Sequence, residues 1–165
     1  MFAKFSLRLT SFLFVLIHFS TLMAQNGRFP IKPDPNLTPG QLCAVADEIR
    51  YPEKIKYCER DVATFTKQSI ILTYDAKLNY SIRLQNRSDF KIDHYIPLCM
   101  GGSNERQNLW PQHKSVYFHT DPLEGLLCEK MKYGRIKQAA AIDLIRQAKN
   151  DLSKIPEILR YAKRL

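Results

Sequence analysis

The chain has 165 residues, of which 45% are hydrophobic, and its 25 Lys and Arg outnumber its 16 Asp and Glu to give a formal charge of +9. That length fits one compact domain with a modest core, and no internal repeat, linker or second domain is visible in it. The surplus of positive charge favours a polyanionic partner such as nucleic acid, anionic lipid or acidic glycan, although it would also keep an ordinary protein soluble.

The first 24 residues are typical of a secretory signal peptide. Lys4 and Arg8 supply the positive start, residues 11–22 supply the apolar segment, and Ala24 supplies a small residue after which cleavage can occur. An uncleaved membrane anchor is the alternative, but the apolar run is short for a bilayer span and contains His18. The pattern therefore predicts export, to a periplasm or out of the cell, with no stable membrane insertion after cleavage.

Four cysteines follow the signal segment, which is typical of a small exported chain stabilised by disulfides. Three pairings are possible, and we favour Cys43 with Cys58 and Cys99 with Cys128, because each pair then closes a short loop within one half of the chain. A zinc site is the competing use of four thiols, but the chain has no Cys-x-x-Cys pair.

The chain after the signal segment begins without a clear pattern. Residues 25–40 carry four prolines and two glycines and predict an extended leader that crosses the surface. Residues 41–49 can form a short helix, which the proline at position 52 should stop. Residues 64–74 remain undecided, because their β-branched residues favour a strand while the spacing of their apolar residues decides nothing.

The second half of the chain has clearer signals and predicts an α+β domain within residues 41–165. Residues 90–95 and 108–112 predict two short strands on either side of a glycine-containing loop. A helix over 123–133 should end at Gly134, and two further helices are expected over 136–149 and from residue 155 onward. The motif core, residues 88–133, is thus a strand, a loop, a strand and a helix.

Three polar residues in this core are suited to phosphodiester chemistry. Asp93 offers a hard oxygen ligand for a divalent cation, and the neighbouring His94 is a suitable base near neutral pH. Asn108 adds a neutral oxygen that can bind a metal or orient the imidazole. Neighbours on a regular strand point to opposite faces, so the first two converge on one site only if the strand ends irregularly, as Pro97 allows.

The stretch from Asp93 combines Asp-His-Tyr-Ile-Pro-Leu, then Gly-Gly-Ser-Asn, then Asn-Leu-Trp-Pro-Gln. In this order and spacing it resembles the HNH endonuclease family of the ββα-metal fold, and the similarity covers roughly residues 57–149. The resemblance implies that Asp93 binds the metal, that His94 activates the attacking water, and that Asn108 is a ligand or a positioner of the base. It also implies a helix over residues 64–74.

The chain departs from the family at the last histidine, because Tyr117 stands where that ligand is usual. His113 and His119 flank this position, and we prefer His119, while water or Asp121 remain alternatives for the third ligand. The implied cofactor is one divalent ion, Mg²⁺ or alternatively Mn²⁺, Zn²⁺ or Ni²⁺. In this interpretation Cys99 lies in the catalytic loop, and its bond to Cys128 would tie that loop to the following helix.

The implied activity is metal-assisted hydrolysis of nucleic acid, DNA more than RNA, that leaves 5′-phosphate and 3′-hydroxyl ends. Cations near the site in sequence are expected to contact phosphates and not bases, which predicts low sequence specificity. They are Arg83, Arg87, Lys91, Arg106 and Lys114. Two alternatives stay open: an inactive nucleic-acid or polyanion binding protein on the same fold, and a disulfide-stabilised structural or inhibitory protein.

Overall fold

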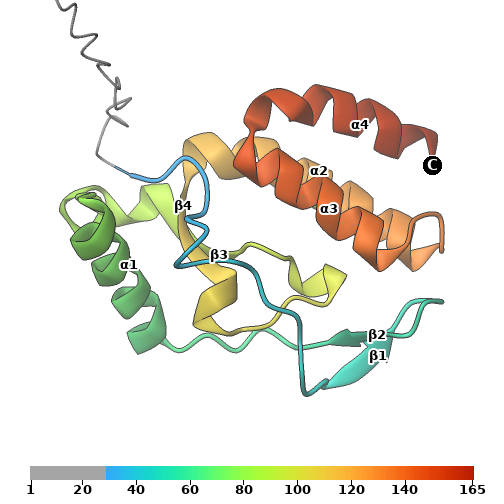
Figure 1. The fold of residues 1–165 in the computed structure, drawn as a ribbon, viewed down its shortest axis with the longest axis horizontal. Helices are drawn as coiled ribbons and strands as arrows, with labels where there is room; N and C mark the ends of the chain where they lie inside the picture. Colours follow the sequence, from blue (N-terminus) through green and yellow to red (C-terminus); the bar gives the residue numbers. More distant parts are fainter. Residues whose placement is uncertain (1–28) are drawn as a thin grey trace, which may run out of the picture.

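The computed structural model describes residues 29–165, so the predicted signal peptide and the start of the leader lie outside the described residues. The described chain has an α+β architecture with helices and two short antiparallel hairpins (Figure 1). Its helices and strands, in order, are β1 (Glu48–Arg50), β2 (Ile55–Tyr57), α1 (Thr64–Leu78), β3 (Phe90–His94), β4 (Leu109–His113), α2 (Lys114–Lys132), α3 (Gln138–Asn150) and α4 (Ile155–Arg164). Among the described residues, no helix is long and apolar enough to cross a membrane.

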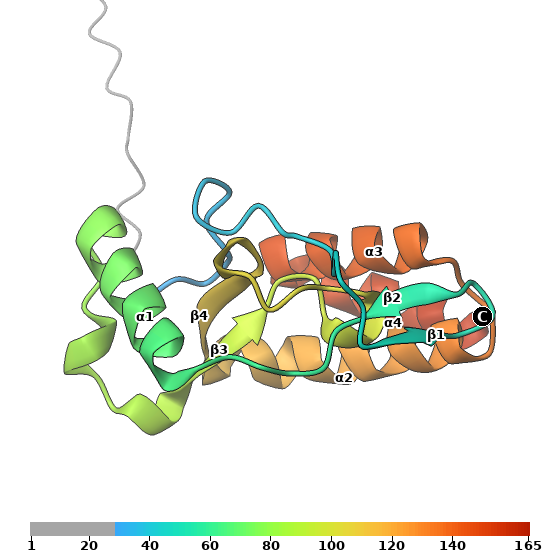
Figure 2. The ribbon, with the colours of Figure 1, turned by 90° about the horizontal axis from the view of Figure 1, so that it is seen from below.

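The β3–β4 hairpin lies between two helical parts of the molecule. On one side α1 packs against β4, and on the other α2 packs against α3 and α4 (Figure 2). Each side has its own apolar core, with Trp110 completely buried on the α1 side and Leu127 completely buried among the three later helices. The hairpin is therefore held rigidly from both sides, which fixes the polar residues at its end.

The loop between β3 and β4 depends on its glycines. Gly101 has φ +81°, a left-handed conformation that only glycine adopts at little cost. At Gly102 an added Cβ would lie 1.8 Å from the carbonyl oxygen of Ile96, so no larger residue fits there. The two glycines let the chain fold back so tightly that Asn108 returns beside Ile96, to whose backbone its side chain is hydrogen-bonded.

The helix expected over residues 41–49 is wrong. Leu42 instead forms a β-bridge with Gly102, and the backbone N–H of Cys43 donates to the carbonyl of Gly101. The backbone groups that a helix would use internally are therefore taken by the glycine loop, and residues 48–50 then pair with β2. A local pattern could not anticipate this pairing, because its partner lies about sixty residues away.

The leader is more firmly packed than a segment merely crossing the surface. Thr38 is fully buried, and its hydroxyl donates to the carbonyl of Leu109 and lies 2.7 Å from the hydroxyl of Tyr74. Residues 64–74, which the pattern left undecided, belong to α1, as the family resemblance implied. The helix predicted over 123–133 is confirmed, but α2 starts nine residues earlier, at Lys114.

The two later helices are confirmed within two residues at their starts, and Pro156 lies in the first turn of α4, where a proline is tolerated. Both predicted disulfides are also present, Cys43 with Cys58 and Cys99 with Cys128. Such bonds are typical of proteins that fold in an oxidising compartment. The second bond joins the loop after β3 to α2 and so connects the site described below to the helical layer.

We expect the double substitution Cys99→Ser/Cys128→Ser to lower the free energy of unfolding by about 3 kcal/mol, because the bond restricts the unfolded chain by closing a loop across a sequence separation of 29 residues. Urea titration of the oxidised protein measures this loss. The matched variant Cys43→Ser/Cys58→Ser, which opens a shorter loop, should lose a similar or slightly smaller amount. Unchanged stability of the first variant would contradict the expected role of that bond.

Candidate active site

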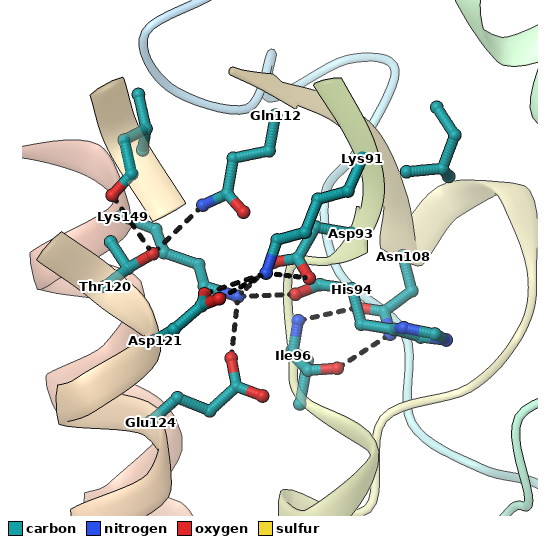
Figure 3. A network of polar contacts seen from close by, with 12 residues as sticks. Lys91, Asp93, His94, Ile96, Asn108, Gln112, Thr120, Asp121, Glu124 and Lys149 are labelled. Atoms are coloured by element: carbon teal, nitrogen blue, oxygen red, sulfur yellow. Dashed lines mark hydrogen bonds and ion pairs between the residues drawn. The ribbon is translucent and has the colours of Figure 1, made fainter. Parts of the chain in front are cut away.

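Asp93 and His94 are adjacent on β3 and both are buried, but their side chains point to opposite faces of the hairpin (Figure 3). Asp93 faces α2 and α3, where Lys149 lies. His94 faces away from these helices, toward Arg60 and Asn104. The strand keeps its regular alternation at this point, so the two residues belong to two separate polar clusters.

The imidazole of His94 is held between two polar side chains. Its Nδ1 lies 3.3 Å from a guanidinium nitrogen of Arg60, and its Nε2 lies 3.0 Å from Oδ1 of Asn104. Because a guanidinium can only donate, Nδ1 accepts and Nε2 carries the proton that it donates to Asn104. Arg60 is itself anchored by a 2.8 Å hydrogen bond to the carbonyl of Ile92. The ring is thereby fixed in one tautomer.

The pKa of His94 is lowered to about 4, mainly by burial and also by the positive charge of Arg60, while the hydrogen bond to Asn104 acts in the opposite direction. The ring is therefore neutral at physiological pH and keeps a lone pair on Nδ1. A neutral imidazole beside a guanidinium is a base next to an anion-binding group.

The low pKa of His94 links folding to pH. Its pKa in the folded chain, about 4, is below its ordinary value of 6.5, so the unfolded chain binds more protons between these two values. The resulting stability is fully present above pH 6.5 and is lost as the pH falls toward 4. We expect the free energy of unfolding to fall by about 2 kcal/mol between pH 7 and pH 5. Urea titrations at both pH values test this expectation. The free energy of unfolding of His94→Gln should fall correspondingly less over the same pH range. Equal losses in the variant and the wild type would rule out His94 as the cause.

A hollow of ≈ 600 Å³ opens beside this pair and is lined by both partners of His94, Arg60 and Asn104. Apart from Arg60, the charged residues that line it are acidic: Asp47, Glu59, Asp61 and Glu105. Arg60 is therefore the one cation of this lining that could attract a phosphate. The rest of a nucleic-acid strand needs cations outside the hollow, because the acidic lining repels it.

On the opposite face, Asp93 is bound by two lysines. Its Oδ2 accepts from Nζ of Lys149 at 2.8 Å, and its Oδ1 lies 3.2 Å from Nζ of Lys91. Lys149 also contacts Glu124 at 3.3 Å, and Lys91 also binds Asp121 at 2.8 Å. Although burial acts to raise the pKa of Asp93, the two ammonium groups hold it below its usual value. Asp93 is therefore a charged group that is already neutralised by the chain.

Asn108 is fully buried and fixes the backbone of the loop. Its Oδ1 accepts from the N–H of Ile96 at 2.8 Å, and its Nδ2 donates to the carbonyls of Ile96 and Ser103, both at 2.9 Å. Both ends of the amide are thus used within the protein. Of the two roles that the resemblance allowed, this arrangement suits a residue that positions the loop of His94 and leaves no oxygen directed toward a metal.

The histidines that were candidates for the third ligand lie apart from Asp93. His119 is exposed on α2, two residues and thus about 200° around the helix from Asp121, which faces Lys91. His113 caps the start of α2, where its Nδ1 accepts from the N–H of Ser115. Within residues 29–165, no three side chains of His, Cys, Asp or Glu are grouped so that they could hold a metal ion. The set Asp93, Asn108 and His119 therefore does not fit a resident metal.

The five cations expected to contact phosphate are mostly engaged in contacts of their own. Lys91 and Lys114 form ion pairs, with Asp121 and Asp89 among their partners. Arg87 donates to a backbone carbonyl, Arg106 donates to two hydroxyls of α1, and Arg83 is exposed. Such contacts hold these side chains in place at the surface, where a phosphate can still exchange for the present partner.

Sequence reasoning missed Arg60, Asn104 and Lys149. Arg60 lies 34 residues before His94 and Lys149 lies 55 residues after it, so no local spacing connects them. Asn104 is part of the Gly-Gly-Ser-Asn segment, and this position in the motif was the one sign in the sequence that it could belong to the site. No family model, curated protein or solved structure matches this chain. The geometry of the site and the motif itself therefore carry the functional argument.

Proposed function

We propose that this chain is an exported endonuclease that hydrolyses phosphodiester bonds of nucleic acid, with DNA favoured and with little sequence specificity. The observation that carries the proposal is the neutral, buried imidazole of His94 held between Arg60 and Asn104 beside an open hollow. In a phosphodiester the negative charge repels nucleophiles, so a site must supply a base and positive charge together. His94 and Arg60 supply both.

The contact between Arg60 and Nδ1 of His94 is long for a hydrogen bond and exchangeable. When a phosphate binds the guanidinium of Arg60, a water molecule takes the place of the guanidinium beside His94 and donates a hydrogen bond to the free Nδ1. The negative charge of the phosphate also raises the pKa of the His94 ring toward neutral pH, which makes the imidazole a stronger base. The water oxygen then attacks phosphorus, its proton passes to Nδ1, the bond to the 3′ oxygen breaks, and that oxygen takes a proton from solvent. Asn104 stabilises the imidazolium through the Nε2 proton.

A divalent ion, which the family resemblance implies, would supply further charge at the leaving oxygen. Because the predicted ligand set does not come together in the described chain, we assign no step to such an ion. Activity assays should nevertheless compare Mg²⁺, Mn²⁺, Zn²⁺ and Ni²⁺ with a chelator, because an ion can arrive bound to the phosphates of the substrate.

Positive charge elsewhere on the molecule supports a polyanionic substrate. A groove of ≈ 600 Å³ is lined by residues of α3, of α4 and of the turn between them, among them Lys154, Glu157, Arg160, Arg164 and the aromatic ring of Tyr161. Within the part of the chain that the structure describes, no ion pair neutralises Arg160 or Arg164. Unpaired arginines beside an aromatic ring suit phosphates and unstacked bases.

A second candidate is a protein that binds nucleic acid without cutting it. The observation that favours it is the neutralisation of Asp93 by Lys149 and Lys91, together with the complete internal use of the Asn108 amide. Both residues would then serve structure alone.

Incubation of the oxidised protein with fluorescent duplex DNA, single-stranded DNA and RNA separates the two candidates. A nuclease gives internal fragments on denaturing gels, in at least one of the metal conditions above. A binding protein raises the fluorescence anisotropy, in a salt-dependent manner, and leaves the strands intact. Intact strands and unchanged anisotropy for every substrate would exclude both.

Arg60→Ala should lower kcat/KM for DNA cleavage by about 10- to 100-fold, because a charged hydrogen bond to the phosphate is lost. The pKa of His94 should rise at the same time, because the nearby guanidinium lowers it in the parent chain; NMR titration of the ring measures this. Arg135→Ala removes an equal charge at an exposed position outside the proposed site and should change neither quantity. A similar loss of kcat/KM in both variants would show that net charge alone, and not the position of Arg60, is responsible.

A further inference from the structure

Lys149 is the most unusual charged residue in the described chain, because its side chain is completely buried. Lysine is seldom fully buried unless it is paired, since removing an ammonium from water is costly. Here the ammonium is compensated: Asp93 and Glu124 raise the pKa of Lys149 although burial acts to lower it. It therefore stays charged inside the protein.

Three oxygen atoms surround the ammonium of Lys149 (Figure 3). They are Oδ2 of Asp93 at 2.8 Å, the backbone carbonyl of His94 at 2.6 Å, and Oε2 of Glu124 at 3.3 Å. The carboxylate and the carbonyl come from β3, Glu124 comes from α2, and the lysine comes from α3. We call these three oxygens the β3–α2 oxygen cage.

The composition of this cage is that of a site for a hard cation. Two carboxylates and a backbone carbonyl are the ligands that Mg²⁺, Mn²⁺ and Ca²⁺ take in proteins. An ammonium group with three N–H donors fills the same place here, and it is covalently attached to α3. The two carboxylates that a metal would need are therefore already bound by a permanent cation.

We propose that Lys149 is the built-in cation of this cage, and that Asp93 is its counter-ion and not a ligand of an exchangeable metal. Through the His94 carbonyl, the ammonium also fixes the end of β3, which makes Lys149 a positioning residue for the imidazole. Any divalent ion required for cleavage then binds away from Asp93. The cage does not depend on catalysis, so the proposal holds or fails independently of the nuclease activity.

Binding of Mn²⁺, measured by the loss of its free EPR signal, tests the proposal on the purified oxidised protein. The wild-type chain should show no Mn²⁺ binding that depends on Asp93. Lys149→Met keeps most of the apolar stem, removes the ammonium and leaves its place vacant, so this variant should bind one Mn²⁺ and gain thermal stability from it. The double variant Lys149→Met/Asp93→Asn should lose that binding. Lys163→Met, which removes an exposed lysine of α4, should behave as wild type.

Two results would overturn the proposal. The first is Mn²⁺ binding by the wild-type chain that Asp93→Asn abolishes, because Asp93 would then be a metal ligand in the natural protein. The second is a Lys149→Met variant that neither binds Mn²⁺ nor is stabilised by it. If Lys149→Met does not fold alone, Mn²⁺ added during refolding should restore the native circular dichroism spectrum, and failure to restore it counts equally against the cage. Intact DNA in a cleavage assay, by contrast, bears only on the proposed function.

Discussion

Replacing His94 by alanine should lower the initial rate of DNA cleavage by about 10²- to 10⁴-fold, the usual contribution of a positioned general base. Among the histidines of residues 29–165, only His94 lies near the hollow with its Nδ1 facing an anion-binding side chain, that of Arg60. Gel-based initial rates with a fluorescent duplex measure the effect. Binding of the same duplex should change little, because the ring itself does not hold the phosphate.

His119→Ala is the matched control, because it removes an exposed histidine from α2. We expect its cleavage rate to equal that of the wild type within a factor of about two. Equal rates for His94→Ala and wild type would remove His94 from the reaction. A large loss in His119→Ala would instead revive this histidine as the third ligand that the family resemblance suggested.

Asp93→Ala should destabilise the fold strongly, and more than the loss of either disulfide or of any exposed ion pair. Lys149 would then keep a buried ammonium without its closest carboxylate, and breaking a buried ion pair in this way typically costs about 3–5 kcal/mol. For a chain of this size the melting temperature should fall by roughly 10 °C. Differential scanning calorimetry of the oxidised protein at pH 7 measures both quantities.

Asp121→Ala provides the comparison on the same cluster. Asp121 pairs with Lys91, and both side chains are partly exposed, so water replaces the lost partner and the cost should stay below about 1 kcal/mol. Equal destabilisation by the two substitutions would mean that Lys149 does not depend on Asp93. It would also weaken the inference that the oxygen cage is built around the ammonium.

The parts of the fold that sequence could predict are those with a local cause. The α2–α4 helices have apolar residues at helical spacing, and the cysteine pairings follow from short loop closures. The helix predicted over residues 41–49 does not form, for the opposite reason: the backbone of this segment pairs with a loop near residue 101. In α1 the β-branched residues suggested a strand, but packing on β4 and the buried side chains of Ile70 and Tyr74 outweigh that weak preference.

In the candidate site too, the sequence predicts the features with a local cause and not those that depend on distant residues. The motif identified His94 and Asn108, and the rule that strand neighbours face opposite sides correctly warned that Asp93 and His94 need not converge. The partners that give these residues their chemistry, Arg60 and Lys149, are brought in by tertiary folding from positions 34 and 55 residues away from His94. Charge and residue type could mark them as cations, but no pattern in the sequence shows that one is exposed beside a base and the other is buried.

The central claim is that this chain cuts the phosphodiester backbone by hydrolysis. The most direct test is incubation of supercoiled plasmid with the oxidised protein, followed by treatment of the products with DNA ligase. We predict nicked circles whose ends carry 5′-phosphate and 3′-hydroxyl, so that ligase reseals them. A plasmid that remains supercoiled at a stoichiometric excess of protein, in every metal condition, would contradict the claim.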